Sequence, residues 1–118
     1  MQRDYNLLLE DILEAITRIK KYTQDMVCDQ FKGDEKTRDA VIRNLEVIGE
    51  TVKALPEEIC KTFPGIEWRK LARLRDKLIH HYFGLDIDII WDIVENKLGE
   101  LEKQIEAILP LNNDGPRT

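Results

Sequence analysis

Residues 4–26 read DYNLLLEDILEAITRIKKYTQDM, and apolar side chains recur along them at alternating spacings of three and four. The seam consists of Tyr5, Leu8, Ile12, Ala15, Ile19, Tyr22 and Met26. This period is that of an amphipathic α-helix. Leu9 and Ile16 widen the apolar stripe, which indicates that neighbouring segments cover the helix on more than one side. We therefore predict a first helix from about residue 4 to about residue 31, roughly 40 Å long.

The same alternating seam marks a second helix. Gly33 and Asp34 are expected to end the first helix and to cap the second, which runs to about Ala54. The apolar positions of the second helix are Val41, Leu45, Ile48, Val52 and Leu55. Gly49 lies in its middle, where glycine costs about 1 kcal/mol relative to alanine. Close approach of a neighbouring helix would explain this glycine.

Three further helices are predicted downstream. A short one begins at Pro56, ends near Phe63 and is followed by the breakers Pro64 and Gly65. A fourth frays near residues 81–84, and its apolar positions are Trp68, Leu71, Leu74, Leu78 and Ile79. A fifth begins near Asp86 and stops at Pro110, and its apolar positions are Ile87, Ile90, Trp91, Val94, Leu98, Leu101, Ile105 and Ile108. We expect an all-α, antiparallel bundle of four to five helices in one domain, residues 1–110, with a disordered tail at residues 111–118.

Additional apolar residues beside the seams favour a homodimer or higher oligomer. They are Ala40, Ile42 and Val47 in the second helix and Ile89 and Ile93 in the fifth. A five-helix monomer that buries some of them internally is the alternative.

Composition bounds the function and the location. The chain has 118 residues and a net charge of −5, which argues against a protein that coats nucleic acid nonspecifically. Cations are nevertheless concentrated between residues 69 and 77, so that a small anion can be held locally; they are Arg69, Lys70, Arg73, Arg75 and Lys77. The N-terminus does not resemble a signal peptide, and no apolar run approaches the roughly 20 residues of a membrane span. With Cys28 and Cys60 expected as free thiols, we predict a cytoplasmic protein.

Common catalytic and cofactor motifs are missing from the sequence. It contains no glycine-rich phosphate loop, no Cys-x-x-Cys, no His-Glu-x-x-His and no Gly-x-Ser-x-Gly. His80 and His81 are adjacent and therefore point to different sides of a helix, so they cannot share a metal as ligands at i and i+4 can. We expect neither a metal nor a cofactor.

What remains is the segment from Arg75 to Tyr82. Arginine offers a permanent cation whose planar fork suits phosphate oxygens, and histidine can transfer protons near neutral pH. These two groups suffice for metal-free RNA cleavage, in which the RNA supplies its own 2′-hydroxyl as nucleophile. The products would carry a 2′,3′-cyclic phosphate and a 5′-hydroxyl.

The geometry of this segment leaves alternatives open. Arg75 and His80 are five residues apart, roughly 140° around an ideal helix, whereas Arg75 and Tyr82 share a face. Unwinding of the helix before Gly84, or pairing across a dimer two-fold axis, would bring Arg75 and His80 together. The simpler interpretation is that Arg75 pairs with an acid at the surface and that His80 is a partly buried helix-end histidine.

Longer blocks of sequence resemble a known family. Arg75-x4-His80-x-Tyr82, followed by FGLD at residues 83–86, resembles the signature of HepT-like toxins of the HEPN superfamily. AVIRNLEVIGE at residues 40–50 is similar to that family's second-helix block, and PGIEW at residues 64–68 to the entry of its motif helix. The similarity extends over about residues 4–108.

The resemblance implies a HEPN-like homodimeric bundle that is a metal-independent endoribonuclease, the toxin of a toxin–antitoxin pair. The substrate would be RNA, including tRNA, and the partner a minimal nucleotidyltransferase antitoxin. By resemblance Arg75 and His80 are the catalytic pair, and Tyr82 is the tyrosine that the antitoxin adenylylates. His81 fits the loose arginine-to-histidine spacing but not the spacing to the tyrosine.

Members of the superfamily often add a polar residue from an earlier helix. The candidates here are Asn44, Glu46 and Glu50, each of which can equally be a capping or salt-bridge residue. The alternative function is a non-catalytic helical binding partner of a nucleotidyltransferase.

Overall fold

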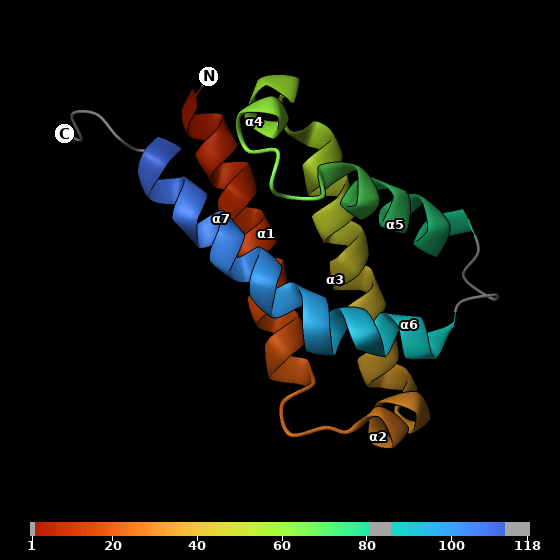
Figure 1. Ribbon diagram of the computed structural model, residues 1–118. Helices are drawn as coiled ribbons and strands as arrows, with labels where there is room; N and C mark the ends of the chain where they lie inside the picture. Colours follow the sequence, from red (N-terminus) through yellow and green to blue (C-terminus); the bar gives the residue numbers. More distant parts are fainter. Residues whose placement is uncertain (1, 81–85, 113–118) are drawn as a thin grey trace.

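Helices account for most of the chain in the computed structural model, which describes residues 2–80 and 86–112 (Figure 1). In chain order they are α1 (Gln2–Tyr22), α2 (Cys28–Gly33), α3 (Glu35–Ala54), α4 (Glu57–Thr62), α5 (Trp68–His80), α6 (Ile87–Asp92), a π-helical segment (Ile93–Lys97) and α7 (Leu98–Asn112). The described residues contain no strand. The prediction of an all-α bundle is confirmed.

The core forms around α1, which packs against α3 on one side and α7 on another (Figure 1). The middle of the seam of α1 and its widened stripe are fully buried: Leu9, Ile12, Ala15, Ile16 and Ile19 have no exposed surface. The two-sided cover expected for this helix is therefore observed. Tyr22, which was expected in the seam, is 40% exposed, and that expectation was wrong.

The predicted first helix is in fact two helices with a turn between them. α1 ends at Tyr22, Asp25 takes a left-handed backbone conformation with φ of 62°, and α2 begins at Cys28. At the start of α2 the backbone N–H of Val27 donates to the side chain of Gln30 at 3.0 Å.

The turn directs α2 across the end of the bundle, where Phe31 is completely buried. Its ring centroid lies 5.1 Å from that of Trp91 on α6. This contact joins residues 60 positions apart in the chain, so the spacing of apolar residues along residues 4–31 does not predict it.

Local signals placed α3 correctly. The carboxylate of Asp34 accepts hydrogen bonds from the backbone N–H of Thr37 at 3.0 Å and from its hydroxyl at 2.8 Å, which confirms the predicted cap. Ile42, assigned to an outward stripe, is only 4% exposed and belongs to the core of the single chain. It therefore gives no support to an oligomer.

The predicted fifth helix is one helical run with a π-helical segment inside it. Asp86 caps its start by accepting from the backbone N–H of Asp88 at 2.9 Å. The run ends at Asn112, two residues beyond the predicted stop at Pro110. Proline removes one backbone donor but keeps a helical φ, so the last turn continues past it. The rest of the predicted tail, residues 113–118, lies outside the described residues.

None of the described helices is both long and apolar enough to cross a membrane.

Candidate functional site

The candidate site lies where α5 crosses α3, the helix against which α5 chiefly packs. α5 begins at Trp68, whose indole N–H donates to the carbonyl of Phe63 at 2.9 Å and so fixes the entry of the helix. Along this helix the apolar residues Leu71, Leu74 and Leu78 are at least partly buried. The other faces of α5 carry the five cations clustered between residues 69 and 77.

At Gly49 on α3 the two helices approach closely. A Cβ atom at Gly49 would lie 2.2 Å from the Cβ of Arg75 and 2.9 Å from the carbonyl oxygen of Leu71. The mid-helix glycine thus has the predicted cause, a neighbouring helix. The residue that occupies the space is Arg75 itself.

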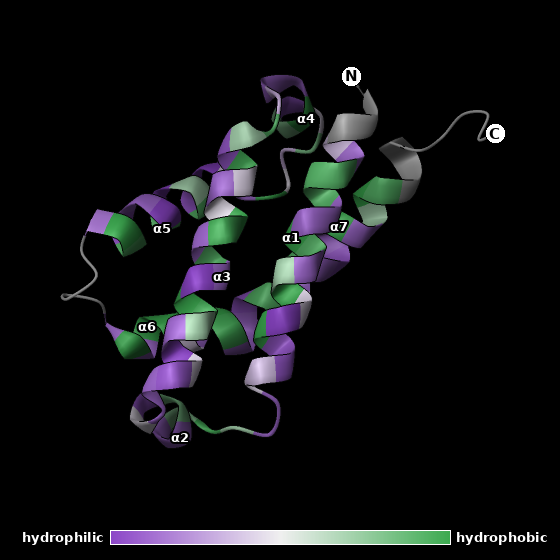
Figure 2. Cartoon of the chain, turned by 180° about the vertical axis from the view of Figure 1, so that it is seen from behind, coloured by the Kyte–Doolittle hydropathy of each residue, from purple (hydrophilic) through white to green (hydrophobic). Residues whose placement is uncertain are grey.

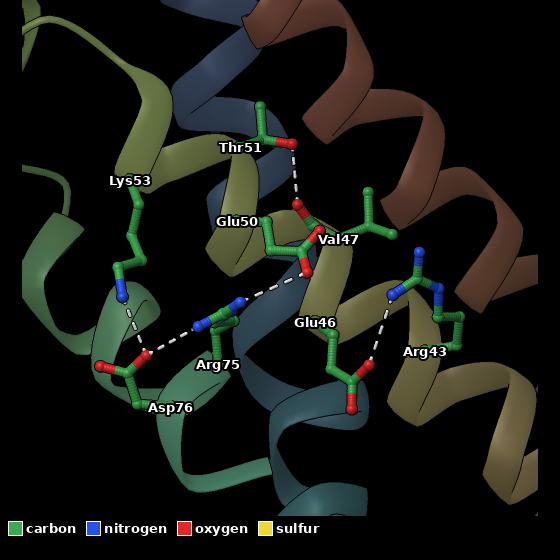
Figure 3. A network of polar contacts seen from close by, with 8 residues as sticks. All are labelled: Arg43, Glu46, Val47, Glu50, Thr51, Lys53, Arg75 and Asp76. Atoms are coloured by element: carbon green, nitrogen blue, oxygen red, sulfur yellow. Dashed lines mark hydrogen bonds and ion pairs between the residues drawn. The ribbon is translucent and has the colours of Figure 1, made fainter. Parts of the chain in front are cut away.

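The guanidinium of Arg75 emerges from this contact into a network of charged side chains (Figure 3). Its Nη1 donates to Oδ1 of Asp76 at 3.2 Å, and its Nη2 lies 3.6 Å from Oε1 of Glu50. Oδ1 of Asp76 also accepts from Nζ of Lys53 on α3, at 2.9 Å. The Arg75 side chain is 26% exposed, and its Nε is buried without a hydrogen bond to any described residue.

Two cations and two carboxylates therefore balance one another in this network. The hydrogen bonds from Lys53 and Arg75 lower the pKa of the Asp76 carboxyl, so Asp76 stays ionised near neutral pH. Ion pairs between partly exposed groups add little net stability, because water and salt screen them. An anionic ligand can thus displace these carboxylates from the Nη groups of Arg75.

His80 is the last residue of α5, and its side chain is exposed. Because α5 is helical from Trp68 through His80, Arg75 and His80 remain separated by roughly 140° around the helix axis. One chain therefore does not bring the two together over its described residues. The simpler interpretation is half right: Arg75 does pair with acids, but His80 is not partly buried. His81 and Tyr82 lie outside the described residues.

Of the three supporting candidates on α3, only Glu50 contacts Arg75. Glu46 lies one turn earlier and is 3.5 Å from Arg43, its ion-pair partner (Figure 3). Asn44 is 8% exposed, and its amide donates to the carbonyl of Ala40 in its own helix at 2.9 Å. Asn44 is thus satisfied locally, on a different side of α3 from Gly49.

Two members of the network, Lys53 and Asp76, were missed by reasoning from the sequence. Asp76 adjoins Arg75 in the chain, but its bond to Lys53 spans 23 residues and crosses between helices. Within residues 2–80 and 86–112, no three His, Cys, Asp or Glu side chains come together in a way that would hold a metal ion.

Comparison with known proteins gives consistent matches over most of the chain. The family described as Ribonuclease HepT-like matches residues 12–108. "Putative RNase MJ0127" of Methanocaldococcus jannaschii is 53% identical over 108 residues, which are 92% of this chain and 89% of that protein. "Probable ribonuclease HepT" of Thermococcus cleftensis is 43% identical over 108 residues, which are 92% of this chain and 98% of that protein. No solved structure matches the chain.

Proposed function

We propose, from the premise that this chain belongs to the ribonuclease HepT-like family, that it is a metal-independent endoribonuclease toxin with Arg75 and His80 as its catalytic pair. The family matches confirm the resemblance first drawn from the motif blocks. The observation that carries the assignment of the site is the position of Arg75, whose Cβ and Cγ lie against Gly49 while its side chain remains partly exposed. His80, exposed at the end of the same helix, supplies the group that moves protons.

The chemistry follows from these two side chains. A neutral imidazole of His80 takes the proton from the 2′-hydroxyl of RNA, and the resulting oxygen attacks the adjacent phosphorus. The Nη groups of Arg75 donate to the non-bridging oxygens, where negative charge accumulates in the phosphorane-like transition state. The bond to the 5′-oxygen breaks, an imidazolium returns a proton to that oxygen, and a 2′,3′-cyclic phosphate remains.

A homodimer would complete the site. Since Arg75 and His80 are about 140° apart on one regular helix, a two-fold axis beside α5 would place Arg75 of one copy near His80 of the other. Ile79, between them in sequence and 39% exposed, gives this surface an apolar residue that a second copy can cover. We expect a mass of twice 13.9 kDa by light scattering, and a monomer at micromolar concentration would refute the composite site.

The decisive experiment is cleavage of single-stranded and tRNA substrates by the purified protein in EDTA. Products should carry cyclic phosphate ends. Arg75→Ala and His80→Ala should each abolish cleavage while helicity and mass in solution stay unchanged. His81→Ala is the matched control and should retain activity. If His81→Ala is inactive and His80→Ala is active, the assignment of His80 as the base is wrong. A dimeric protein that cuts no RNA would favour the alternative function, a non-catalytic binding partner of a nucleotidyltransferase.

Regulation by a nucleotidyltransferase antitoxin is the second part of the proposal. On an ideal helix a residue seven positions after Arg75 shares its face, and an adenylyl group on Tyr82 would bring an anionic phosphodiester to compete for the guanidinium. Coexpression with the cognate nucleotidyltransferase should add about 329 Da per adenylyl unit at Tyr82. Tyr82→Phe should cut RNA but escape this modification. An unmodified Tyr82 in a fully silenced complex would instead show inhibition by binding alone.

A further inference from the structure

A groove separates α5 from α6 and the π-helical segment that follows it. Its volume is about 700 Å³, and side chains from both walls line it. Leu71 and Leu74 contribute from α5, and Ile89 and Ile93 from the opposite wall. In Figure 2 α6 is mainly green, the colour of hydrophobic residues, while green and purple alternate along α5.

Ile89 makes this groove an unusual surface. It is 58% exposed, although its neighbours Ile90 and Trp91 on α6 are only 2% and 8% exposed. Leu71, Leu74 and Ile93 are half-buried against the core and add to the accessible apolar floor. Ile89 and these three residues line one groove, and apolar residues gathered in one exposed patch, unlike ones scattered singly, mark a binding surface.

The rim of the groove is cationic in a chain whose net charge is −5. Four cationic side chains and two carboxylates line it. Lys70 is already paired with Glu67 at 2.8 Å, and the Asp86 carboxylate caps α6. Arg73 and Lys77 form no ion pair with a described residue, whereas Lys97 is close enough to help lower the pKa of the Glu67 carboxyl. The rim therefore presents uncompensated positive charge.

We propose that this groove binds an amphipathic helix with acidic flanks, supplied by a protein partner. An apolar floor between two helices accepts a third helix through anchors at i, i+3 or i+4, and i+7, while acidic flanks meet the cations of the rim. The floor also favours protein over RNA. Nucleotide bases bind chiefly by stacking on aromatic rings, and the described lining residues include none.

Neither Arg75 nor His80 lines the groove, although His80, seven residues after Arg73, shares the face of that rim cation. Leu74, in the groove wall, and Arg75, against α3, are adjacent in sequence and so point about 100° apart on α5. Binding in the groove therefore leaves the Arg75 guanidinium accessible. The inference does not rest on the proposed nuclease activity, and protein inactivated by Arg75→Ala should bind equally well.

The probe is a fluorescein-labelled helical peptide of about four turns with leucine at the anchor positions and glutamate on both flanks, used in three registers. Anisotropy at low salt should show saturable binding by at least one register. A matched peptide with lysine in place of glutamate should bind the protein at least about tenfold more weakly. The acidic peptide should likewise bind the Ile89→Asp and Lys77→Glu variants at least about tenfold more weakly than the unmodified protein. Val27→Asp is the control, since Val27 is 60% exposed but lies outside the groove.

Three results would overturn the proposal. One is the absence of saturable binding by any acidic peptide to protein whose helicity is intact. Another is dissociation of the chain into monomers by Ile89→Asp, which would make the groove an interface between copies. The third combines two results: the Lys77→Glu variant loses RNA binding, and RNA and the acidic peptide do not compete for the unmodified protein. RNA would then bind at the rim and the peptide elsewhere.

Discussion

Replacement of Gly49 by alanine tests whether the α3–α5 contact fixes Arg75. The added Cβ would meet the Cβ of Arg75 at 2.2 Å, its Cγ at 3.0 Å and the carbonyl oxygen of Leu71 at 2.9 Å. The Cβ of Arg75 and the Leu71 carbonyl move only with the backbone, so rotation of a flexible side chain does not relieve the overlap. Carbon atoms in good contact lie about 3.5–4.0 Å apart, and α5 must therefore shift by roughly 1.3 Å or more.

The consequences for stability and activity differ in size. Overpacking costs about 1–3 kcal/mol, while replacing a mid-helix glycine with alanine returns about 1 kcal/mol, so Gly49→Ala should destabilise the fold by about 0–2 kcal/mol. A displacement of about 1 Å at a catalytic group can reduce the rate by about 10²-fold. We expect the loss of RNA cleavage to exceed what the loss of stability explains.

Gly99→Ala is the matched control. Gly99 lies within the helical run of residues 87–112, and a Cβ there would meet nothing within 4 Å. This variant should gain about 0.5–1 kcal/mol in the free energy of unfolding and cut RNA normally. Urea unfolding followed by circular dichroism measures stability, and single-turnover cleavage measures the chemical step. If Gly49→Ala behaves like Gly99→Ala in both assays, the reasoning is refuted.

Three other perturbations probe the fold and the charge network. The pKa of the Asp34 carboxyl is lowered because the backbone N–H and the hydroxyl of Thr37 donate hydrogen bonds to it. The stability that Asp34 contributes is therefore present above about pH 3.8 and is lost as the pH falls through the lower pKa of the folded state. Asp34→Asn should keep the helix cap, so that urea titrations at stepped pH show a smaller loss of stability in acid. Phe31→Ala should cost about 3–5 kcal/mol in the same assay, because it empties a fully buried site against Trp91; a loss below about 1 kcal/mol would contradict the packing. Glu50→Gln removes a carboxylate 3.6 Å from Arg75 and should tighten RNA binding roughly two- to fivefold at low salt, whereas a fall in cleavage rate at unchanged affinity would make Glu50 a positioning residue.

The bundle could be predicted from the sequence wherever the deciding forces are local. The seam of α3, its Asp34 cap and the start of α6 near Asp86 follow from neighbours within four residues, and all are observed. The turn after Tyr22 is different, since Tyr22 and Met26 continue the helical spacing through it. It brings Phe31 onto Trp91, a contact between distant parts of the chain that no local pattern encodes.

The candidate site divides in the same way. The presence of a close neighbour at Gly49 could be inferred from the cost of a mid-helix glycine, but not that the neighbour is Arg75. The separation of Arg75 and His80 follows from helix geometry alone, and the regular α5 preserves it. The bond between Lys53 and Asp76 depends on how α5 crosses α3, which is a property of the assembled bundle.

The position of α5 connects the two proposed surfaces. α5 packs chiefly against α3, and its other walls face the groove and solvent. At Gly49 there is no room for α5 to move closer to α3, since even a single added carbon would overlap Arg75. A helix bound in the groove can therefore change the site only by drawing α5 away from α3 or sliding it along that helix. Either movement separates Arg75 from Glu50 and Lys53 from Asp76, because each pair joins one helix to the other. Movement of α5 on α3 is thus one route by which a partner in the groove would act on Arg75.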